Sequence, residues 1–208
     1  MSRKQVIKDP KQYLRSVDPI LARVIDRIPS PQTKRRRANY FKSLVEAIIS
    51  QQLSNKAADT IILRFRQLFK QSGFPTPRQV LRMPDAGIRR AGLSFGKISY
   101  IKDLARRIEK KQLNLRKLRY LADEELIIQL TEVKGIGRWT AEMFLMFSLE
   151  RPDVFSHGDL GLRNAIHKLY GFKKSPTVKQ VEKIIAKWRP HRTLASRYLW
   201  RSLDNQKT

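Results

Sequence analysis

The chain has 208 residues, of which 41% are hydrophobic, 44 are lysine or arginine and 18 are acidic, so its formal net charge is +26. Such a charge is not needed for solubility and indicates a polyanionic partner, while the absence of cysteine excludes disulfides, thiolate zinc sites and iron–sulfur clusters. The N-terminal MSRKQVIKDP has no apolar segment and no stretch approaches the roughly 18 apolar residues of a membrane span, so we expect a soluble, intracellular protein of the cytoplasm and nucleoid, or of the nucleus in a eukaryote.

Helical periodicity extends over nearly the whole chain, and no convincing alternation of polar and apolar residues indicates a strand. Asp18, Asn39, Ser54 and Asp123 each stand where a side-chain oxygen could cap a following helix. In chain order, helices are expected at about 19–28, 40–52 and 55–69, from 77 and from 85, at about 97–110, from 123 to the Gly135–Gly137 turn and again after it, and at about 160–170, 177–188 and 191–203. The sequence therefore predicts an all-α protein of about ten helices.

The basic residues are dispersed along these segments and form no single tail. They occur as Lys34–Arg37, Arg64/Arg66, Arg89/Arg90, Arg106/Arg107, Lys110/Lys111, Arg116–Arg119 and Lys173/Lys174. A solvated helix face accounts for any one of these groups, but the total favours a phosphate-bearing partner. We interpret Lys34–Arg37 as a phosphate-facing patch in preference to a nuclear signal.

The segment Leu130–Glu142 (LTEVKGIGRWTAE) is predicted to form helix, tight turn and helix. Apolar residues supply a helical face on each side of the turn; they are Leu126, Ile127, Leu130 and Val133 before it and Trp139, Met143, Phe144, Met146 and Phe147 after it. Gly135 and Gly137 permit the turn, because glycine adopts positive φ without steric cost. Such a turn directs free amides and a helix N-terminus toward one point, which favours a phosphate of a nucleic-acid backbone.

Four blocks of sequence carry a resemblance to a known family. They are Ala47–Ala58 (AIISQQLSNKAA), Val133–Glu142 (VKGIGRWTAE), Val154–Arg163 (VFSHGDLGLR) and Trp188–Trp200 (WRPHRTLASRYLW). Similar hairpins also occur in polymerases, ligases and helicase accessories. Together, however, the blocks resemble the helix-hairpin-helix (HhH-GPD) DNA glycosylase superfamily, and within it the 3-methyladenine DNA glycosylase II, or alkylbase glycosylase, type.

This resemblance implies the all-helical, two-lobed fold of the superfamily. One lobe, about 38–148, would contain the hairpin, and the other would combine residues 1–37 with 149–208. The reactive pocket would lie between the lobes. Bacterial relatives often have an additional N-terminal α/β domain, which the short segment before Tyr40 leads us to expect is absent here.

Asp159 corresponds, within the resemblance, to the catalytic aspartate of the family. A fixed carboxylate stabilises the positive charge that develops at the sugar C1′ and can orient or deprotonate the attacking water. An Asp before a helix is also typical of an N-cap, and the two roles are compatible because a helix N-terminus favours the ionised form. Lyase-competent relatives have a lysine nucleophile where this chain has Trp139, so the resemblance implies a hydrolase without abasic-site lyase activity.

Trp139 and Trp200 match aromatic positions of the family's base pocket. Their rings would attract a cationic alkylated purine by stacking and cation–π contact, although the alternative for each is an ordinary core aromatic. Tyr40, Phe41 and Met143 are weaker candidates for the pocket and fit the core better.

A base inside a duplex must be flipped out before it can be excised, and a protein side chain must fill the gap that it leaves in the base stack. The position between two helices offers Gln52 and Leu53 as equal candidates for this wedge. Gln51 is expected to support the turn or to contact DNA. The alternative for all three is a simple helix-capping turn.

The hairpin is expected to contact DNA through Lys134, Gly135, Ile136, Gly137 and Arg138. The resemblance also implies an optional monovalent cation, held by the main-chain carbonyls of Thr131, Val133 and Ile136. Arg163 suits a phosphate contact or an ion pair equally. His157 suits a hydrogen bond within its loop better than a substrate contact, and no second ligand stands at metal-binding spacing.

The sequence thus predicts a monofunctional DNA glycosylase that flips out and hydrolytically excises alkylated purines, chiefly 3-methyladenine, in base excision repair. Its expected partners are damaged double-stranded DNA and the downstream enzymes that process abasic sites. We expect a monomer with no required cofactor. Two alternatives remain, namely the same fold acting on uracil, hypoxanthine or mismatched thymine, and a non-catalytic DNA-binding module.

Overall fold

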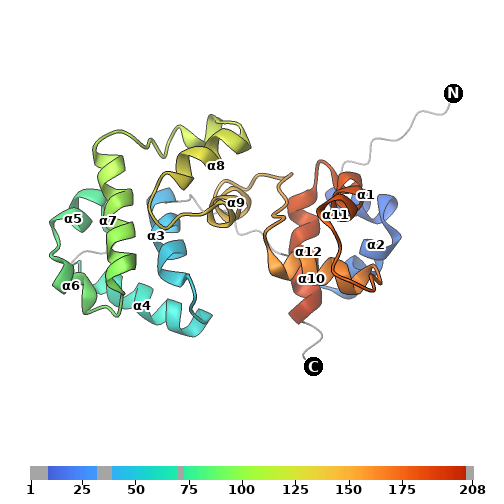
Figure 1. Ribbon diagram of the computed structural model, residues 1–208, viewed down its shortest axis with the longest axis horizontal. Helices are drawn as coiled ribbons and strands as arrows, with labels where there is room; N and C mark the ends of the chain where they lie inside the picture. Colours follow the sequence, from blue (N-terminus) through green and yellow to red (C-terminus); the bar gives the residue numbers. More distant parts are fainter. Residues whose placement is uncertain (1–8, 32–38, 70–72, 205–208) are drawn as a thin grey trace. The chain divides into compact units, whose positions relative to one another are not determined.

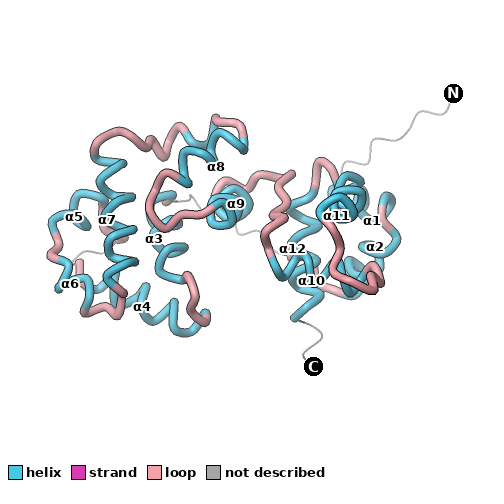
Figure 2. Tube along the Cα trace, viewed as in Figure 1, coloured by secondary structure: helices cyan, strands magenta, loops and turns pink. Residues whose placement is uncertain are grey.

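The computed structural model describes residues 9–31, 39–69 and 73–204 (Figure 1). Throughout these ranges the regular structure is helical, which confirms the predicted all-α class (Figure 2). The chain divides into two compact units, a terminal unit of Met1–Arg36 and Glu150–Thr208 and a central unit of Arg37–Leu149. The predicted basic patch at Lys34–Arg37 lies outside the described residues. None of the described helices combines the length and apolar character needed to cross a membrane.

The central unit contains the predicted hairpin. Its elements are α3 (Tyr40–Ser50), α4 (Asn55–Gln67), α5 (Pro77–Arg82), α6 (Asp85–Arg89), α7 (Phe95–Glu109), the 3-10 turn η1 (Leu118–Tyr120), α8 (Asp123–Thr131) and α9 (Arg138–Phe147). Helix α7 packs against α3, α5 and α6, while α3 also contacts α4 and α9 (Figure 1). The side chains of Leu44, Ile48, Phe65, Ile101 and Leu104 are fully buried between these helices.

The terminal unit is built from both ends of the chain. It comprises α1 (Pro10–Val17), α2 (Pro19–Arg27), α10 (Leu160–Leu169), α11 (Val178–Ile185), the 3-10 turn η2 (Ala186–Trp188) and α12 (Arg192–Asp204). Helix α12 packs against α10, α2 and α1. One apolar cluster holds the unit together, with Leu14, Ile25, Ile166, Trp188 and Leu199 among its buried members.

Three of the four capping residues predicted from the sequence, Asp18, Asn39 and Ser54, stand at helix starts. Asn39 Oδ1 accepts the amide of Lys42 at 3.0 Å, and Ser54 Oγ accepts that of Ala57 at 3.4 Å. Both confirm the expected caps. The first helix, α1, was not predicted, although Asp9 and Pro10 repeat the cap-and-proline signal that marks α2.

The predicted cap at Asp123 is wrong by one residue. Asp123 is the first residue of α8, and the cap position belongs to Ala122. Alanine has no side-chain acceptor, so a residue inside the first turn of α8 must supply the hydrogen bond at the start of the helix. The carboxylate of Glu125 accepts the Ala122 amide at 3.1 Å.

Asp18 does more than cap α2. Its Oδ1 accepts the amides of Ile20 and Leu21, both at 3.0 Å. Its Oδ2 accepts the Tyr170 hydroxyl at 2.6 Å and the Trp188 indole N–H at 2.9 Å. Asp18 is 2% exposed, so this network joins α2 to the end of α10 and to η2 inside the core.

Candidate active site and nucleic-acid interface

The hairpin turn, defined here as Glu132–Gly137, joins α8 to α9. The amide of Ile136 donates to Val133 O at 3.0 Å, and Gly137 is the N-cap residue of α9. Gly135 has φ +78°, and a Cβ at this position would collide with the ring of Tyr100, whereas a Cβ at Gly137 would meet nothing within 4 Å. Gly135 is therefore fixed by its own unit, while Gly137 faces open space at a helix N-terminus, as a phosphate site requires.

The wedge turn, defined here as Gln51–Ser54, joins α3 to α4. Gln52 has φ +57°, in the left-handed region that non-glycine residues rarely occupy. Both Gln52 and Leu53 are exposed, and Leu53 presents 37% of its surface. Either side chain is thus available as the predicted wedge.

Gln51 links the two turns. Its side-chain Nε2 donates to Gly135 O at 2.7 Å, across 84 positions of sequence. Of the two roles expected for Gln51, the structure shows the supporting one. The contact ties the turn that carries the wedge candidates to the turn that offers a phosphate site.

Lys97 and Asp103, on α7, are functional candidates that the sequence analysis missed. The Lys97 ammonium donates to the carbonyls of Ile49 at 2.7 Å and Gln51 at 2.8 Å. Asp103 accepts the amide of Lys134 at 3.1 Å and is 8% exposed. The sequence contains a signal for Lys97, because the helix dipole disfavours a positive charge in the first turn of a helix, so a lysine there implies another partner.

Asp159 stands at the start of α10, and the residue is 7% exposed. Its Oδ1 accepts the amide of Leu162 at 2.8 Å, which confirms the N-cap role. The same oxygen accepts the indole N–H of Trp200 at 2.9 Å, from α12. A Cβ on Gly161 would lie 3.1 Å from Asp159 Oδ1 and 3.2 Å from Trp200 Cδ1, so this glycine leaves room for the pair. The carboxylate is held from two directions, as a preorganised charge must be.

The aromatic candidates divide by exposure. Trp139 is 49% exposed on α9, and Trp200 is half-buried beside Asp159. Tyr40 is half-buried with its ring edge-on to Phe144, and Met143 is also half-buried. Trp139, Tyr40 and Met143 of the central unit and Trp200 of the terminal unit each keep an exposed part of the ring or side chain.

Phe41 does not suit the base pocket. It is 6% exposed, and its ring packs edge-on against Phe74 at 6.1 Å between centroids. Burial in the central unit leaves no ring face for a base. The structure therefore places Phe41 in the core, which was the preferred of its two expected roles.

Arg138, which is expected to contact DNA, forms ion pairs within the central unit. It binds both carboxylate oxygens of Glu124 at 2.7 Å and Glu142 Oε1 at 3.0 Å. The hydrogen bonds with Glu124 hold the pKa of Arg138 above its usual range and that of Glu124 below its usual range. Arg138 thus belongs to an ion-pair network that joins α8 to α9, and its contact with DNA stays a prediction because 59% of the side chain is exposed.

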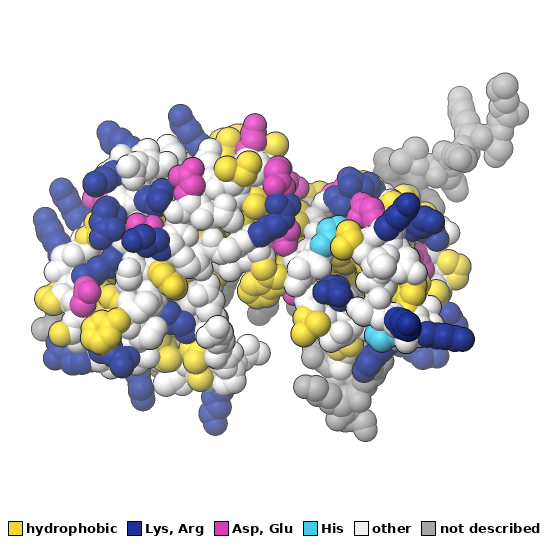
Figure 3. Space-filling model, viewed as in Figure 1, with side chains coloured by type: hydrophobic (Ala, Val, Ile, Leu, Met, Phe, Trp, Pro, Cys, Tyr) yellow, Lys and Arg dark blue, Asp and Glu magenta, His cyan; other side chains and the backbone are white. Residues whose placement is uncertain are grey.

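The remaining polar candidates lie at the surface. Arg163 donates to Ser175 Oγ at 3.2 Å, and Lys134 is exposed in the hairpin turn. His157 Nε2 lies 3.1 Å from Glu182 Oε2, which assigns it to a pair with α11. Figure 3 shows lysine and arginine side chains over much of the visible face of the central unit, as a polyanion-binding surface requires.

No cluster of three histidine or acidic side chains suited to a metal ion occurs among residues 9–31, 39–69 and 73–204. The carbonyls expected to hold a cation belong to Thr131 at the end of α8 and to Val133 and Ile136 in the hairpin turn. One of them, Val133 O, already accepts an amide, that of Ile136. A carbonyl oxygen has two lone pairs, so this hydrogen bond leaves one lone pair of Val133 O available to coordinate a cation.

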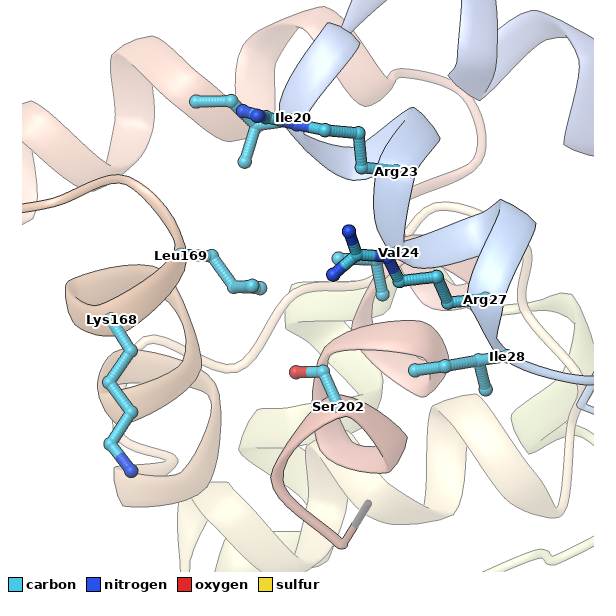
Figure 4. A pocket seen from close by; sticks show the side chains of 8 residues that line it. All are labelled: Ile20, Arg23, Val24, Arg27, Ile28, Lys168, Leu169 and Ser202. Atoms are coloured by element: carbon cyan, nitrogen blue, oxygen red, sulfur yellow. The ribbon is translucent and has the colours of Figure 1, made fainter. Parts of the chain in front are cut away.

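A separate cavity of about 410 Å³ lies in the terminal unit (Figure 4). It is lined by Ile20, Arg23, Val24, Arg27, Ile28, Lys168, Leu169 and Ser202. None of these is a predicted site residue, and the cavity does not include Asp159 or Trp200. It is therefore distinct from the carboxylate site.

Comparisons with known proteins agree with the four sequence blocks. Residues 45–191 match the HhH-GPD superfamily of base excision DNA repair proteins. The chain is 38% identical over 173 residues to DNA-3-methyladenine glycosylase 1 of Schizosaccharomyces pombe, covering 83% of this chain and 76% of that protein. A solved 3-methyladenine DNA glycosylase from the same yeast, in complex with abasic DNA, has a TM-score of 0.82 and 35% identity over 94% of this chain and 96% of that one. A DNA-3-methyladenine glycosidase from Bacillus halodurans also has a TM-score of 0.82, with 36% identity over 99% and 94%. The chain therefore belongs to the HhH-GPD superfamily.

Proposed function

We propose that this protein is a monofunctional DNA glycosylase that flips alkylated purines out of duplex DNA and hydrolyses their N-glycosidic bonds. Its chief substrate would be 3-methyladenine, with 7-methylguanine as a further one. The observation that carries the proposal is the buried carboxylate of Asp159, held by Leu162 and Trp200 in the block that resembles the family's catalytic segment. The names of the similar proteins support the same class of substrate.

The chemistry requires little beyond a fixed negative charge. Breakage of the bond between C1′ and the base leaves the electron pair on the base and positive charge on the sugar. Asp159 would stabilise this charge, and a water oxygen would then bond to C1′ as its proton passes to the carboxylate. Purines alkylated at N3 or N7 are cationic before cleavage and leave as neutral bases, so no dedicated acid is needed.

The absence of lyase activity follows, in this proposal, from the residue after the hairpin turn. A lyase of this superfamily uses a lysine amine there to form a Schiff base with C1′. Trp139 has no such nucleophile. Borohydride should therefore trap no covalent enzyme–DNA adduct, and a trapped species would refute this part of the proposal.

The DNA would be held at two places in the central unit. The amides of Gly135 and Gly137 would bind a backbone phosphate, with a monovalent cation on the carbonyls of Thr131, Val133 and Ile136 beneath it. The wedge turn would fill the gap left by the extruded nucleotide, at a cost of a few kcal/mol for unstacking. The monomeric protein would then release an abasic strand to the downstream repair enzymes.

The decisive experiment compares base release by the wild type and Asp159→Asn. Duplex DNA treated with a methylating agent is incubated with each protein, and the released bases are identified by chromatography. Asparagine keeps an oxygen for the Leu162 and Trp200 donors and is itself a good N-cap, so the substitution removes the charge without removing the cap. We expect the rate to fall by about 10²–10³-fold or more, with DNA binding retained.

Asp26→Asn is the matched control, because Asp26 is a carboxylate of the same unit in an exposed pair with Arg15. It should release bases at the wild-type rate. Retained release by Asp159→Asn would refute the mechanism. The same assay is run on duplexes that contain uracil, hypoxanthine or a mismatched thymine. Release of one of these bases in place of alkylpurines would assign a different substrate, and a wild type that releases nothing from any duplex would leave a non-catalytic DNA-binding module.

A further inference from the structure

Helix α7 contacts both turns that are expected to meet DNA. Lys97, Tyr100 and Asp103 are spaced by three residues, which places them along one side of the helix. Lys97 binds the wedge turn, whereas Tyr100 and Asp103 contact the hairpin turn at Gly135 and Lys134. The two turns are far apart in sequence, so α7 is a common support that fixes their spacing.

Lys97 stabilises the end of α3 directly before the wedge candidates. The last carbonyls of a helix have no partner within the helix and carry partial negative charge. The Lys97 ammonium binds two carbonyls there, those of Ile49 and Gln51, and the next residue is Gln52 with its left-handed backbone. Such a conformation persists only where its surroundings enforce it.

The hairpin end of the support is independent of Lys97. The carboxylate of Asp103 accepts the Lys134 amide and is itself bound by Arg107 Nε at 3.1 Å. Arg107 also binds Glu132 at 3.1 Å. The Gln51 side chain connects the wedge turn directly to the hairpin turn by donating to Gly135 O. Loss of Lys97 should therefore loosen the wedge turn while the phosphate-binding turn stays in place.

We propose that Lys97 is a positioning residue for base extrusion, acting through the Ile49 and Gln51 carbonyls to hold the wedge turn at a fixed distance from the hairpin turn. This inference rests on the proposed glycosylase function and adds a residue to it. Lys97 need not touch the base, the sugar or the water. Substitution of Lys97 should therefore slow the extrusion of the base from the DNA duplex and should not slow cleavage of the N-glycosidic bond.

The test is Lys97→Met, which keeps an unbranched side chain and removes both hydrogen bonds. Lys102→Met is the matched control, because Lys102 lies on the same helix and pairs with Asp85 of α6, away from both turns. Single-turnover release of 7-methylguanine is measured from two duplexes. In one the lesion is paired with cytosine, and in the other it lies opposite an abasic-site analogue, where extrusion is easier.

We expect Lys97→Met to slow release from the paired duplex by about tenfold to a hundredfold, the range for loss of hydrogen bonds to a charged group. Release from the unpaired duplex should change by less than about threefold, and Lys102→Met should match the wild type on both. An equal loss on both duplexes would show a general defect and overturn the inference, as would no loss on either. A wild type that releases no methylated purine, either from these duplexes or from DNA treated with a methylating agent, would instead refute the proposed function.

Chemical rescue provides a second readout. The sequence contains no cysteine, so Lys97→Cys introduces a unique thiol. Alkylating the unfolded variant with 2-bromoethylamine and refolding it restores an ammonium at nearly the lysine length, whereas iodoacetamide adds a neutral group of similar size. Recovery of the paired-duplex rate with the ammonium alone supports the inference. Equal recovery, or none, with both reagents would overturn it.

Discussion

Gly161→Ala should separate the stability of the protein from its activity. Gly161 lies in the first turn of α10, where alanine is favoured over glycine by about 0.5–1 kcal/mol. Its new Cβ, however, would stand 3.1 Å from Asp159 Oδ1 and 3.2 Å from Trp200 Cδ1, which is tighter than ordinary contact. The carboxylate and the indole must therefore each move away from the new methyl group by a few tenths of an ångström.

The expected loss of rate follows from how steeply catalysis depends on the position of the catalytic carboxylate. A displacement of about 1 Å can cost about 10²-fold in rate, so a shift of a few tenths should slow base release by roughly 3–10-fold. Thermal unfolding should show a midpoint equal to or above that of the wild type. Single-turnover release of methylated purines gives the rate, and the two measurements use the same preparation.

Gly96→Ala serves as the control, since Gly96 also lies in a helix and its new Cβ would meet only Ser94 Oγ at 3.9 Å. It should raise the unfolding midpoint through the same helical gain and leave the rate unchanged. If Gly161→Ala released bases as fast as the wild type, the close fit of Asp159 and Trp200 would be irrelevant to the reaction. A large fall in its unfolding midpoint would show that crowding outweighs the helical gain, which would also contradict the reasoning.

Three further predictions concern stability and binding. Asp18→Ala should lower the free energy of unfolding by about 3–5 kcal/mol, because it removes a helix cap and leaves the Tyr170 and Trp188 donors buried without their acceptor. Urea unfolding measures this free energy, and a loss below about 1 kcal/mol would contradict the prediction. Because bonds from Arg138 hold the pKa of Glu124 down, the stability that this pair contributes is present at neutral pH and lost as the pH falls through the folded-state pKa. Glu124→Gln should therefore weaken the acid dependence of the unfolding midpoint, and an unchanged pH profile would refute this. Raising the salt from about 50 to 200 mM should weaken DNA binding by orders of magnitude if six or more phosphates are contacted, whereas a flat response would contradict the polyanion argument.

The helices could be predicted because their signals are local. Asp18 with Pro19, and Asn39, mark helix starts through a side-chain oxygen and a ring that act within three residues. The same logic should have identified α1 at Asp9 and Pro10, but this helix has eight residues and buries only Leu14, so its periodicity is too short to detect.

The site was less predictable because its contacts are long-range. The bond from Trp200 to Asp159 spans 41 positions, and that from Gln51 to Gly135 spans 84. Only the packing of helices brings these residues together. Tyr40 and Phe41 illustrate the same limit, since adjacent aromatic residues on one helix become a half-buried ring and a core ring according to what packs above each.

The left-handed backbone at residue 52 sets two selection pressures against each other. Glycine or asparagine would relax the main chain there, whereas a long side chain would serve an intercalating role better. A saturation library at this position, scored once for heat resistance and once for survival of methylation damage in cells, should therefore rank the amino acids in opposite orders if residue 52 enters the duplex. If Leu53 enters instead, both screens should favour the same small residues at 52, and the trade-off should vanish.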